Sequence, residues 1–121
     1  MARILIVDDE PSVRKLVSKL LRSEGLDVVE ARDGAEALAL VAVTPADLIL
    51  LDIDMPGMDG LETLRRLRRK APKAVVIMVS GINDEVRALR AIDEGARDFI
   101  RKPFELALLK EVVLRHLALA A

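Results

Sequence analysis

The sequence predicts an α/β fold in which a parallel β-sheet is covered by helices on both faces. Short apolar runs typical of strands alternate with segments of helical periodicity along the 121 residues. Strict alternation of this kind is typical of parallel sheets built from β-α-β units. The first, third and fourth apolar runs are also nearly continuous, which indicates strands that are buried on both faces of the sheet.

Five segments are predicted as strands: 3–7, 27–30, 47–51, 74–79 and 98–101. Because crossovers between parallel strands are right-handed, the carboxyl ends of these strands should lie along one edge of the sheet. Ligands of open sheets bind outside that edge, near the point where the strand order reverses. We therefore expect the functional residues to follow the strand ends.

The first helical segment begins at Pro11, a position at which helices tolerate proline, and Gly25 lies just past its end. Its apolar residues recur with helical spacing, at Val13, Leu16, Val17, Leu20 and Leu21. The second helical segment starts after Asp33-Gly34 and stops before Pro45. Both segments are therefore bounded by residues that commonly begin or end helices.

Three further helices are predicted from the same signals. The third spans about 61–70, ahead of Pro72. The fourth begins near Asn83, a favourable N-cap, and ends at Gly95. The fifth follows Pro103 and spans about 105–119. With the five strands, these helices complete a (βα)5 arrangement.

Composition excludes several classes of protein. The length fits one domain with one core, so we expect 1–121 to form a single domain, and 52% hydrophobic with 32% charged residues is typical of a soluble globular chain. The absence of cysteine excludes disulfides and thiolate metal sites. A net charge of −1 without Trp or Tyr offers nothing for direct nucleic-acid binding. Apolar runs are too short for a membrane span or a secretory signal, so we expect a cytoplasmic protein.

Polar residues with a shared chemistry follow four of the predicted strands: Asp8 and Asp9, Asp52 and Asp54, Ser80, and Lys102. Carboxylates within a few Å of one another raise one another's pKa unless they share protons or bind a cation. Asp8, Asp9 and Asp52 offer only oxygen ligands, which favours Mg²⁺, or Mn²⁺, over Zn²⁺. A hydroxyl and an ammonium group suit phosphoryl oxygens, and one carboxylate can then act as the nucleophile. The strand ends therefore predict a phosphoryl-transfer site.

Four motifs, in this order and at this spacing, resemble the response-regulator receiver domain, the CheY-like family of two-component signalling: "ILIVDDE" (4–10), "LILLDIDMPGMDG" (48–60), "VIMVSG" (76–81) and "FIRKPF" (99–104). The resemblance covers essentially the whole chain. It implies a flavodoxin-like three-layer sandwich whose five parallel strands lie in the order 2-1-3-4-5. It also implies a phosphorylation-activated switch that catalyses only its own phosphorylation and dephosphorylation, rather than a conventional enzyme.

The resemblance implies roles for the acidic residues. Asp52 would accept a phosphoryl group from a phosphohistidine on a sensor histidine kinase or a histidine phosphotransfer protein. Asp9 would bind Mg²⁺ directly, and Asp8 partly through water. The backbone carbonyl of Asp54 would supply a further ligand, while its side chain would place an additional acid near the site.

The resemblance also implies a switch. Ser80, at a position where Thr is commoner, would move toward the phosphoryl group, and Lys102 would pair with that group. Phe99 would be the aromatic switch residue, without the hydroxyl of the Tyr often found there. The Lys102-Pro103 peptide would be cis, and the small Gly81 would leave the site open to a phosphodonor.

The face formed by the fourth helix, fifth strand and fifth helix would contact a downstream target or output domain, or form a homodimer. Arg87, Arg90 and Arg101 are expected on or near this face. The basic run at 64–70 is expected to be a solvated helix surface, and His116 to be exposed or partly packed without a catalytic partner.

Two other functions remain open from the sequence. "DID" at 52–54 is similar to the nucleophile and acid/base pair of haloacid-dehalogenase-type phosphohydrolases, although Pro56 and the short chain oppose this reading. A degenerate receiver acting only as a protein-binding module is a second alternative. An FMN carrier of flavodoxin type is excluded, because the chain lacks a hydroxyl- and glycine-rich phosphate loop and stacking aromatics. The position of Met1 and the end of the last helix favour a stand-alone protein over an excised domain.

Overall fold

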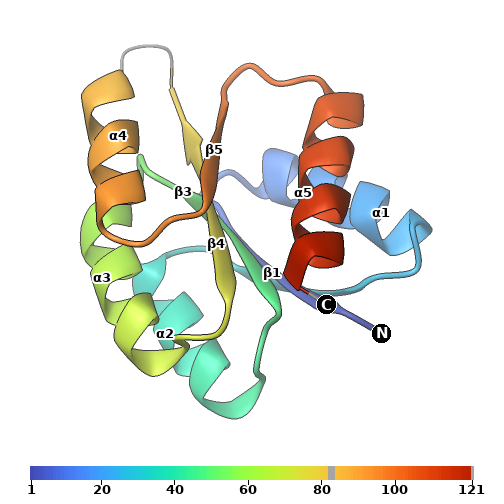
Figure 1. Cartoon of the computed structure of the whole chain (residues 1–121), viewed down its shortest axis with the longest axis horizontal. Coiled ribbons are helices and arrows are strands. Elements are labelled where there is room, and N and C mark those ends of the chain that lie inside the picture. Colours follow the sequence, from blue (N-terminus) through green and yellow to red (C-terminus); the bar gives the residue numbers. More distant parts are fainter. Residues whose placement is uncertain (82–83, 121) are drawn as a thin grey trace.

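The computed structural model describes residues 1–81 and 84–120, and Figure 1 shows their arrangement. The strands are β1 Arg3–Val7, β2 Asp27–Ala31, β3 Leu48–Asp52, β4 Val75–Ser80 and β5 Asp98–Arg101. The helices are α1 Pro11–Ser23, α2 Gly34–Val43, α3 Gly60–Lys70, α4 Glu85–Asp93 and α5 Leu106–Ala120. Strands and helices alternate along the chain as predicted.

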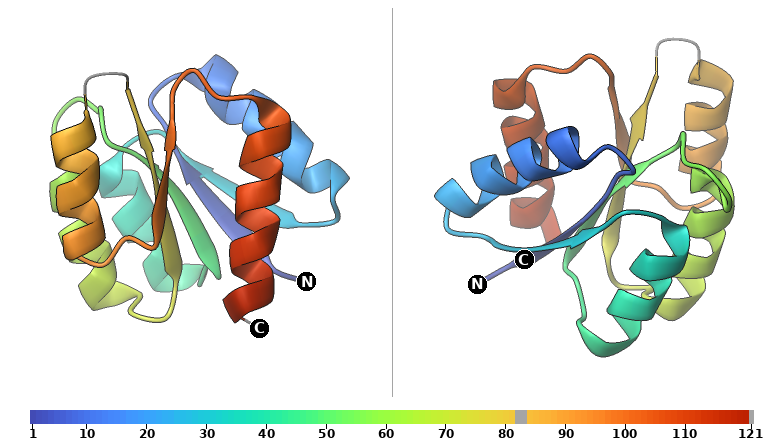
Figure 2. Two further views of the ribbon diagram at one scale, coloured as in Figure 1. Left: turned by 45° about the horizontal axis from the view of Figure 1, so that its top comes forward. Right: turned by 180° about the vertical axis from the view of Figure 1, so that it is seen from behind.

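The strands form one parallel sheet in the order β2-β1-β3-β4-β5, which confirms the predicted order. Helices α1 and α5 lie on one face of the sheet, and α2, α3 and α4 lie on the other (Figures 1 and 2). In register, Val7 pairs with Leu51 and Asp52 pairs with Val79. The carboxyl ends of β1, β3 and β4 therefore meet at one edge of the sheet.

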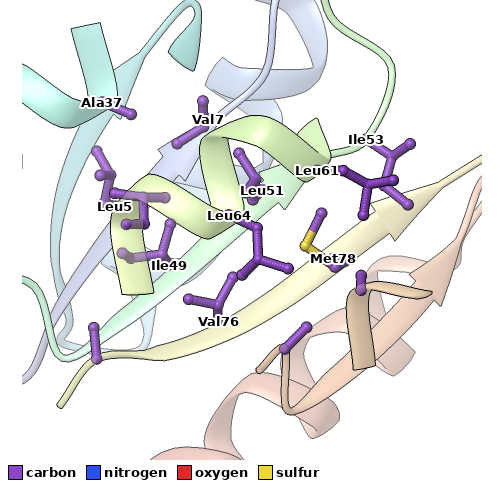
Figure 3. Close-up of a cluster of buried hydrophobic side chains, with 14 of the residues drawn as sticks. Leu5, Val7, Ala37, Ile49, Leu51, Ile53, Leu61, Leu64, Val76 and Met78 are labelled. Carbon is purple, nitrogen blue, oxygen red and sulfur yellow. The ribbon is translucent and has the colours of Figure 1, made fainter. Parts of the chain in front are cut away.

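Each face of the sheet has its own hydrophobic core. In β3, Ile49 and Leu51 pack toward α2 and α3, together with Leu64 and Leu67 of α3 (Figure 3). Leu48 and Leu50, one residue out of phase, pack toward α1 and α5. Side chains of successive strand residues point to opposite faces, so a continuous apolar strand serves both cores. This is why β3 is buried along its whole length.

Three strands, β2, β3 and β4, end one residue later than predicted, at Ala31, Asp52 and Ser80. The β3 ladder includes Asp52 because the backbone N–H of Ile53 donates to the carbonyl of Val79 at 2.9 Å, and the β4 ladder includes Ser80 because its carbonyl accepts from the backbone N–H of Lys102 at 2.6 Å. Asp52 and Ser80 are therefore held by the sheet itself rather than by the following loops. Both side chains are buried, with 3% and 1% of their surface exposed.

Helices α2 and α3 begin at aspartate N-caps. The side chain of Asp33 accepts a hydrogen bond from the backbone N–H of Glu36 at 2.8 Å, and that of Asp59 accepts from Glu62 at 2.9 Å. Such caps satisfy backbone donors that the first helical turn leaves free. The expected N-cap of the fourth helix, Asn83, lies outside the described residues, and α4 begins at Glu85.

Helix α4 is attached to the sheet by small side chains. Its buried residues are Ala88 and Ala91, whereas Val86 and Leu89 are 74% and 62% exposed. Helix α5 differs, because it buries the larger Leu109, Val112 and Val113. The two helices that flank β5 therefore hold the sheet with very different amounts of apolar contact.

The prediction that the His116 side chain is exposed or partly packed was wrong. The side chain is 8% exposed, and its Nε2 lies 2.9 Å from Oδ2 of Asp98 in β5. Because α5 packs along the sheet, it brings position 116 next to a strand residue 18 positions earlier. The contact links α5 to the residue that precedes Phe99.

The described part of the chain contains no helix with both the length and the apolar character needed to cross a membrane.

Candidate functional site

Three carboxylates meet at the carboxyl edge of the sheet. Asp8 and Asp9 follow the end of β1, and Asp52 is the last residue of β3. One oxygen from each of the three lies within 4.8 Å of the others. Asp8 and Asp52 are buried, while Asp9 is exposed. A compact group of hard oxygen donors with one open side suits a Mg²⁺ ion that keeps several water ligands.

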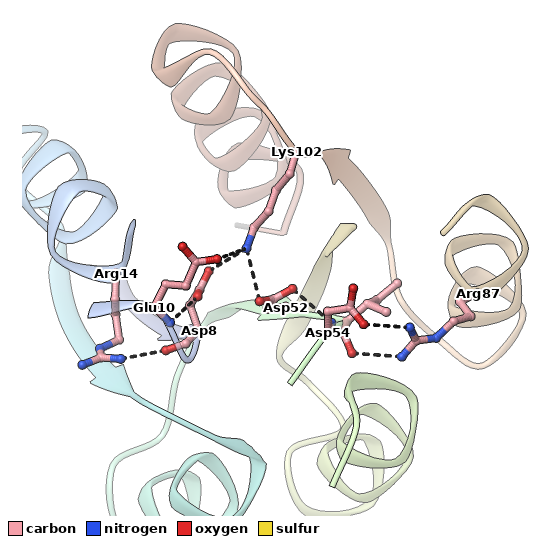
Figure 4. A network of polar contacts seen from close by, with 8 residues as sticks. Asp8, Glu10, Arg14, Asp52, Asp54, Arg87 and Lys102 are labelled. Carbon is pink, nitrogen blue, oxygen red and sulfur yellow. Dashed lines mark hydrogen bonds and ion pairs between the residues drawn. The ribbon is translucent and has the colours of Figure 1, made fainter. Parts of the chain in front are cut away.

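Lys102 places an ammonium group beside these carboxylates. Its Nζ lies 3.2 Å from Oδ2 of Asp8 and 3.2 Å from Oδ2 of Asp52 (Figure 4). Glu10 lies further away, with Oε1 at 3.9 Å. Lys102 follows β5, its backbone N–H donates to the carbonyl of Ser80 at 2.6 Å, and its peptide bond to Pro103 is cis, as the resemblance implies.

The site holds more negative charge than Lys102 balances. Burial raises the pKa of Asp52, Lys102 lowers it and Asp8 raises it, and the result is a pKa of about 6 instead of 3.8. Burial also lowers the pKa of Lys102, but the charges of Asp52 and Asp8 raise it above its ordinary value overall. A divalent cation would relieve this repulsion, so the donor set fits a metal ion.

The loop after β3 is folded back closely on the strand end. The backbone N–H of Asp54 donates to Oδ1 of Asp52 at 3.1 Å, which leaves Oδ2 facing Lys102. The backbone N–H of Gly60 donates to the carbonyl of Ile53 at 2.9 Å. A Cβ at position 60 would lie 2.5 Å from the Cα of Ile53 and 2.6 Å from the carbonyl oxygen of Asp52. This close approach to the backbone of Asp52 and Ile53 requires glycine at position 60.

A groove of ≈ 680 Å³ opens beside the acidic cluster. Its polar side is lined by Glu10, Asp54, Gly81, Asp84 and Lys102. Its apolar side is lined by Val13, Leu16 and Val17 of α1 and by the segment after β5. The groove therefore borders Lys102, whose ammonium group contacts the carboxylates of Asp8 and Asp52.

Comparison with known proteins identifies the family. Residues 4–114 match the model of the response regulator receiver domain. The chain belongs to this family. Receiver domains are the phosphoacceptor switches of two-component systems, and as a family they interact with histidine kinases and output domains.

Named relatives include stand-alone and multidomain regulators. The receiver is 41% identical over 106 residues to the chemotaxis protein CheY of Listeria monocytogenes, covering 87% of this chain and 89% of CheY. It is 44% identical over 116 residues to the nitrogen assimilation regulatory protein NtrX of Azorhizobium caulinodans, covering 94% of this chain and 26% of NtrX. It is 39% identical over 113 residues to the DNA-binding response regulator MtrA of Mycolicibacterium smegmatis, covering 93% of this chain and 48% of MtrA. The receiver thus spans about half or less of the latter two relatives.

Solved structures agree on the fold. A receiver domain protein (CheY-like) from Methanospirillum hungatei superposes with a TM-score of 0.94 at 31% identity, covering 99% of this chain and 96% of that one. NtrX from Brucella abortus gives a TM-score of 0.93 at 39% identity, covering 99% of this chain and 28% of that one. The predicted flavodoxin-like architecture is confirmed.

The structure brings most of the predicted site residues together. Asp8, Asp9, Asp52 and Lys102 form one cluster, and Ser80 lies at the end of the strand next to β3. Phe99, which pairs in register with Met78, is half-buried against the core beneath α2, α3 and α4. The basic run of α3 is partly solvated, as expected, although Arg65 also binds Glu94 and Arg68 binds backbone carbonyls.

The sequence interpretation missed two residues. Glu10 was recognised as part of an acidic motif but given no role, and it lies near Lys102. Arg87 was expected on or near the face of α4, β5 and α5, but its guanidinium turns instead toward the loop after β3. No local signal in the sequence indicates that direction, because it depends on how α4 sits against a loop more than thirty positions away.

Magnesium is expected to stabilise the receiver at about pH 8, where Asp52 is ionised. Adding about 10 mM MgCl₂ should raise Tm by roughly 2–5 °C, because the ion binds the folded state. At about pH 5 the shift should shrink, since protonation of Asp52 removes one ligand charge. Thermal unfolding followed by circular dichroism, with Asp52→Asn as the control, measures both effects. An equal shift in the variant would contradict the assignment of the metal ligands.

Proposed function

We propose that this receiver accepts a phosphoryl group on Asp52 from the phosphohistidine of a sensor histidine kinase or a histidine phosphotransfer protein, in a Mg²⁺-dependent reaction. The observation that carries the proposal is the position of Asp52, which is 3% exposed and lies between two further acids and the ammonium group of Lys102. Asp52 ends a strand that is buried along its whole length, and a phosphodonor would approach from the groove that Lys102 and Asp54 line.

In the reaction, a carboxylate oxygen of Asp52 forms a bond to phosphorus as the bond from phosphorus to the histidine nitrogen breaks. The bonding pair leaves with the imidazole, which takes up a proton. Asp8, Asp9, Asp52 and the backbone carbonyl of Asp54 would hold Mg²⁺, which neutralises charge on the phosphoryl oxygens when bound. Lys102 would shift its contact from Oδ2 of Asp52 to a phosphoryl oxygen.

Phosphorylation would then change the surface that a partner contacts. Ser80 would move toward the phosphoryl group, and Phe99 would occupy the space that it leaves. Val86 and Leu89 on α4 and Leu108 on α5 are exposed apolar side chains on the two helices flanking β5. Such side chains suit contact with a downstream target, an output domain or a second copy of this chain.

The test is phosphorylation by acetyl phosphate in the presence of Mg²⁺. The wild-type protein should gain the mass of one phosphoryl group, in an acid-stable and base-labile form typical of an acyl phosphate. Asp52→Asn should abolish the gain, because it removes the nucleophile, while Asp54→Asn should retain it. Equal labelling of Asp52→Asn would overturn the assignment. Continuous release of phosphate from a generic phosphomonoester would instead favour the phosphohydrolase alternative.

A further inference from the structure

Arg87 in the first turn of α4 binds three oxygen atoms from two segments of the chain, and Figure 4 shows its contacts with the segment after β3. Its Nη2 donates to the carbonyl of Ile53 at 3.1 Å, and its Nη1 donates to Oδ1 of Asp54 at 3.1 Å. Nη1 also lies 3.3 Å from Oδ1 of Asp84. One guanidinium group therefore joins α4 to the loop that follows the proposed phosphoacceptor.

Both carboxylates held by Arg87 lie at the mouth of the site. Asp54 and Asp84 line the same groove as Lys102. A Cβ at Gly81, directly after Ser80, would lie 3.4 Å from Oδ2 of Asp84 and 4.0 Å from Oδ2 of Asp54. Asp54 is also tied to Asp52, since its backbone N–H donates to Oδ1 of that residue at 3.1 Å. The backbone of Asp54 therefore contacts Asp52, while its side chain contacts Arg87.

The charge of Asp54 matters because the site already contains three acids. A free carboxylate at its mouth would repel an anionic phosphodonor and attract a divalent cation. In the structure, Arg87 binds Asp54 and opposes its charge. Burial lowers the pKa of Arg87, but the hydrogen bond to Asp54 and the charges of Asp84, Asp54 and Asp59 raise it overall, so the guanidinium remains charged.

We propose that Arg87 is a positioning residue for phosphoryl transfer, which acts by holding the Asp54 carboxylate away from the metal and the incoming phosphodonor. The inference rests on the proposed function, because it concerns the rate at which Asp52 is phosphorylated. It makes a prediction of its own: the effect of Arg87 should depend on the presence of Asp54.

Arg87→Ala is expected to have two effects of opposite sign. Mg²⁺ should bind about two- to fivefold more tightly, because a nearby positive charge is lost and a carboxylate is freed. Phosphorylation by acetyl phosphate at saturating Mg²⁺ should become about three- to tenfold slower, because the freed carboxylate repels the donor. A general loosening of the fold would instead weaken metal binding and slow phosphorylation together.

The experiment measures Mg²⁺ affinity by isothermal titration calorimetry and the rate of mass gain with acetyl phosphate. Asp54→Asn in the Arg87→Ala background should return both quantities to near the wild-type values. Arg87→Lys should give intermediate values, since it keeps the charge but not the forked hydrogen bonds. Arg90→Ala removes the same charge from an exposed position on α4 and should change neither quantity.

Three results would overturn the inference while wild-type protein is still phosphorylated: unchanged Mg²⁺ affinity and rate in Arg87→Ala, an equal effect of Arg90→Ala, or no restoration by Asp54→Asn. If wild-type protein binds Mg²⁺ but takes no phosphoryl group, the proposed function fails, and the inference fails with it. The failures are therefore distinguishable.

Discussion

Asp52→Asn is expected to increase the free energy of unfolding at about pH 8 by roughly 1–3 kcal/mol in the absence of Mg²⁺. Burial and the neighbouring Asp8 raise the pKa of Asp52 from 3.8 to about 6, against the lowering effect of Lys102. The ionised form of Asp52 is therefore less favourable in the folded state than in the unfolded chain. The neutral amide removes this cost, although it also loses the attraction to Lys102 at 3.2 Å, which limits the gain.

The increase in the free energy of unfolding caused by Asp52→Asn should itself grow as pH rises. Between about pH 4 and pH 6 the folded protein binds more protons at Asp52 than the unfolded chain does, so this residue makes stability fall as pH rises through that window. The stability curves of wild type and Asp52→Asn should therefore converge near pH 4 and separate to a constant difference above about pH 6. Urea denaturation in EDTA at several pH values measures the two curves.

The matched control is Asp54→Asn, which removes the same charge from a side chain that is 71% exposed. Its stability should differ little from wild type across the same pH range, because an exposed ion pair contributes little. A destabilised Asp52→Asn at about pH 8 would contradict the electrostatic account of the site.

Gly60→Ala should lower the free energy of unfolding by roughly 2–4 kcal/mol and also slow phosphorylation strongly. The added methyl group would meet the Cα of Ile53 at 2.5 Å, the carbonyl oxygen of Asp52 at 2.6 Å and that of Ile53 at 2.9 Å. These are backbone atoms of the strand end and its loop, and they cannot turn away as a side chain does. The loop must shift, and Asp52 must shift with it.

The two readouts for Gly60→Ala are urea denaturation and labelling by acetyl phosphate. Gly81→Ala is the control, because its Cβ would meet only the carboxylates of Asp84 at 3.4 Å and Asp54 at 4.0 Å, which can move. It should remain close to wild type in stability. A stable Gly60→Ala protein with normal labelling would show that the loop tolerates displacement and that the fixed orientation of Asp52 is unimportant.

The fold and the acidic cluster were predictable from the sequence because both depend on local patterns and one topological rule. Continuous apolar runs indicated buried strands, and parallel strands place their carboxyl ends at one edge. Asp8 and Asp52 lie 44 positions apart in the sequence, yet this rule is enough to place them together. The single-residue errors at the ends of β3 and β4 did not change which edge these side chains reach.

The sequence did not predict which residues of other elements the side chains of Arg87 and His116 contact. Arg87 and His116 each contact a residue on another element, Asp54 and Asp98 respectively. Helical spacing gives the face on which a residue lies, but not the rotation of the helix against a particular loop or strand. Both partners are acidic residues whose positions relative to the helix follow from tertiary packing, so the sequence pattern contains no sign of either contact.

The attachment of α4 through Ala88 and Ala91 has a mechanical consequence. Two methyl groups lose little dispersion energy when a helix slides by a fraction of a turn, whereas interlocked leucine and valine side chains, as in α5, resist such a displacement. Of the two helices beside β5, α4 is thus the one with the lower barrier to translation. The movement proposed for Ser80 would then be converted into a larger shift of Val86 and Leu89, so that the surface of α4 would change while the packed layers beneath stay intact.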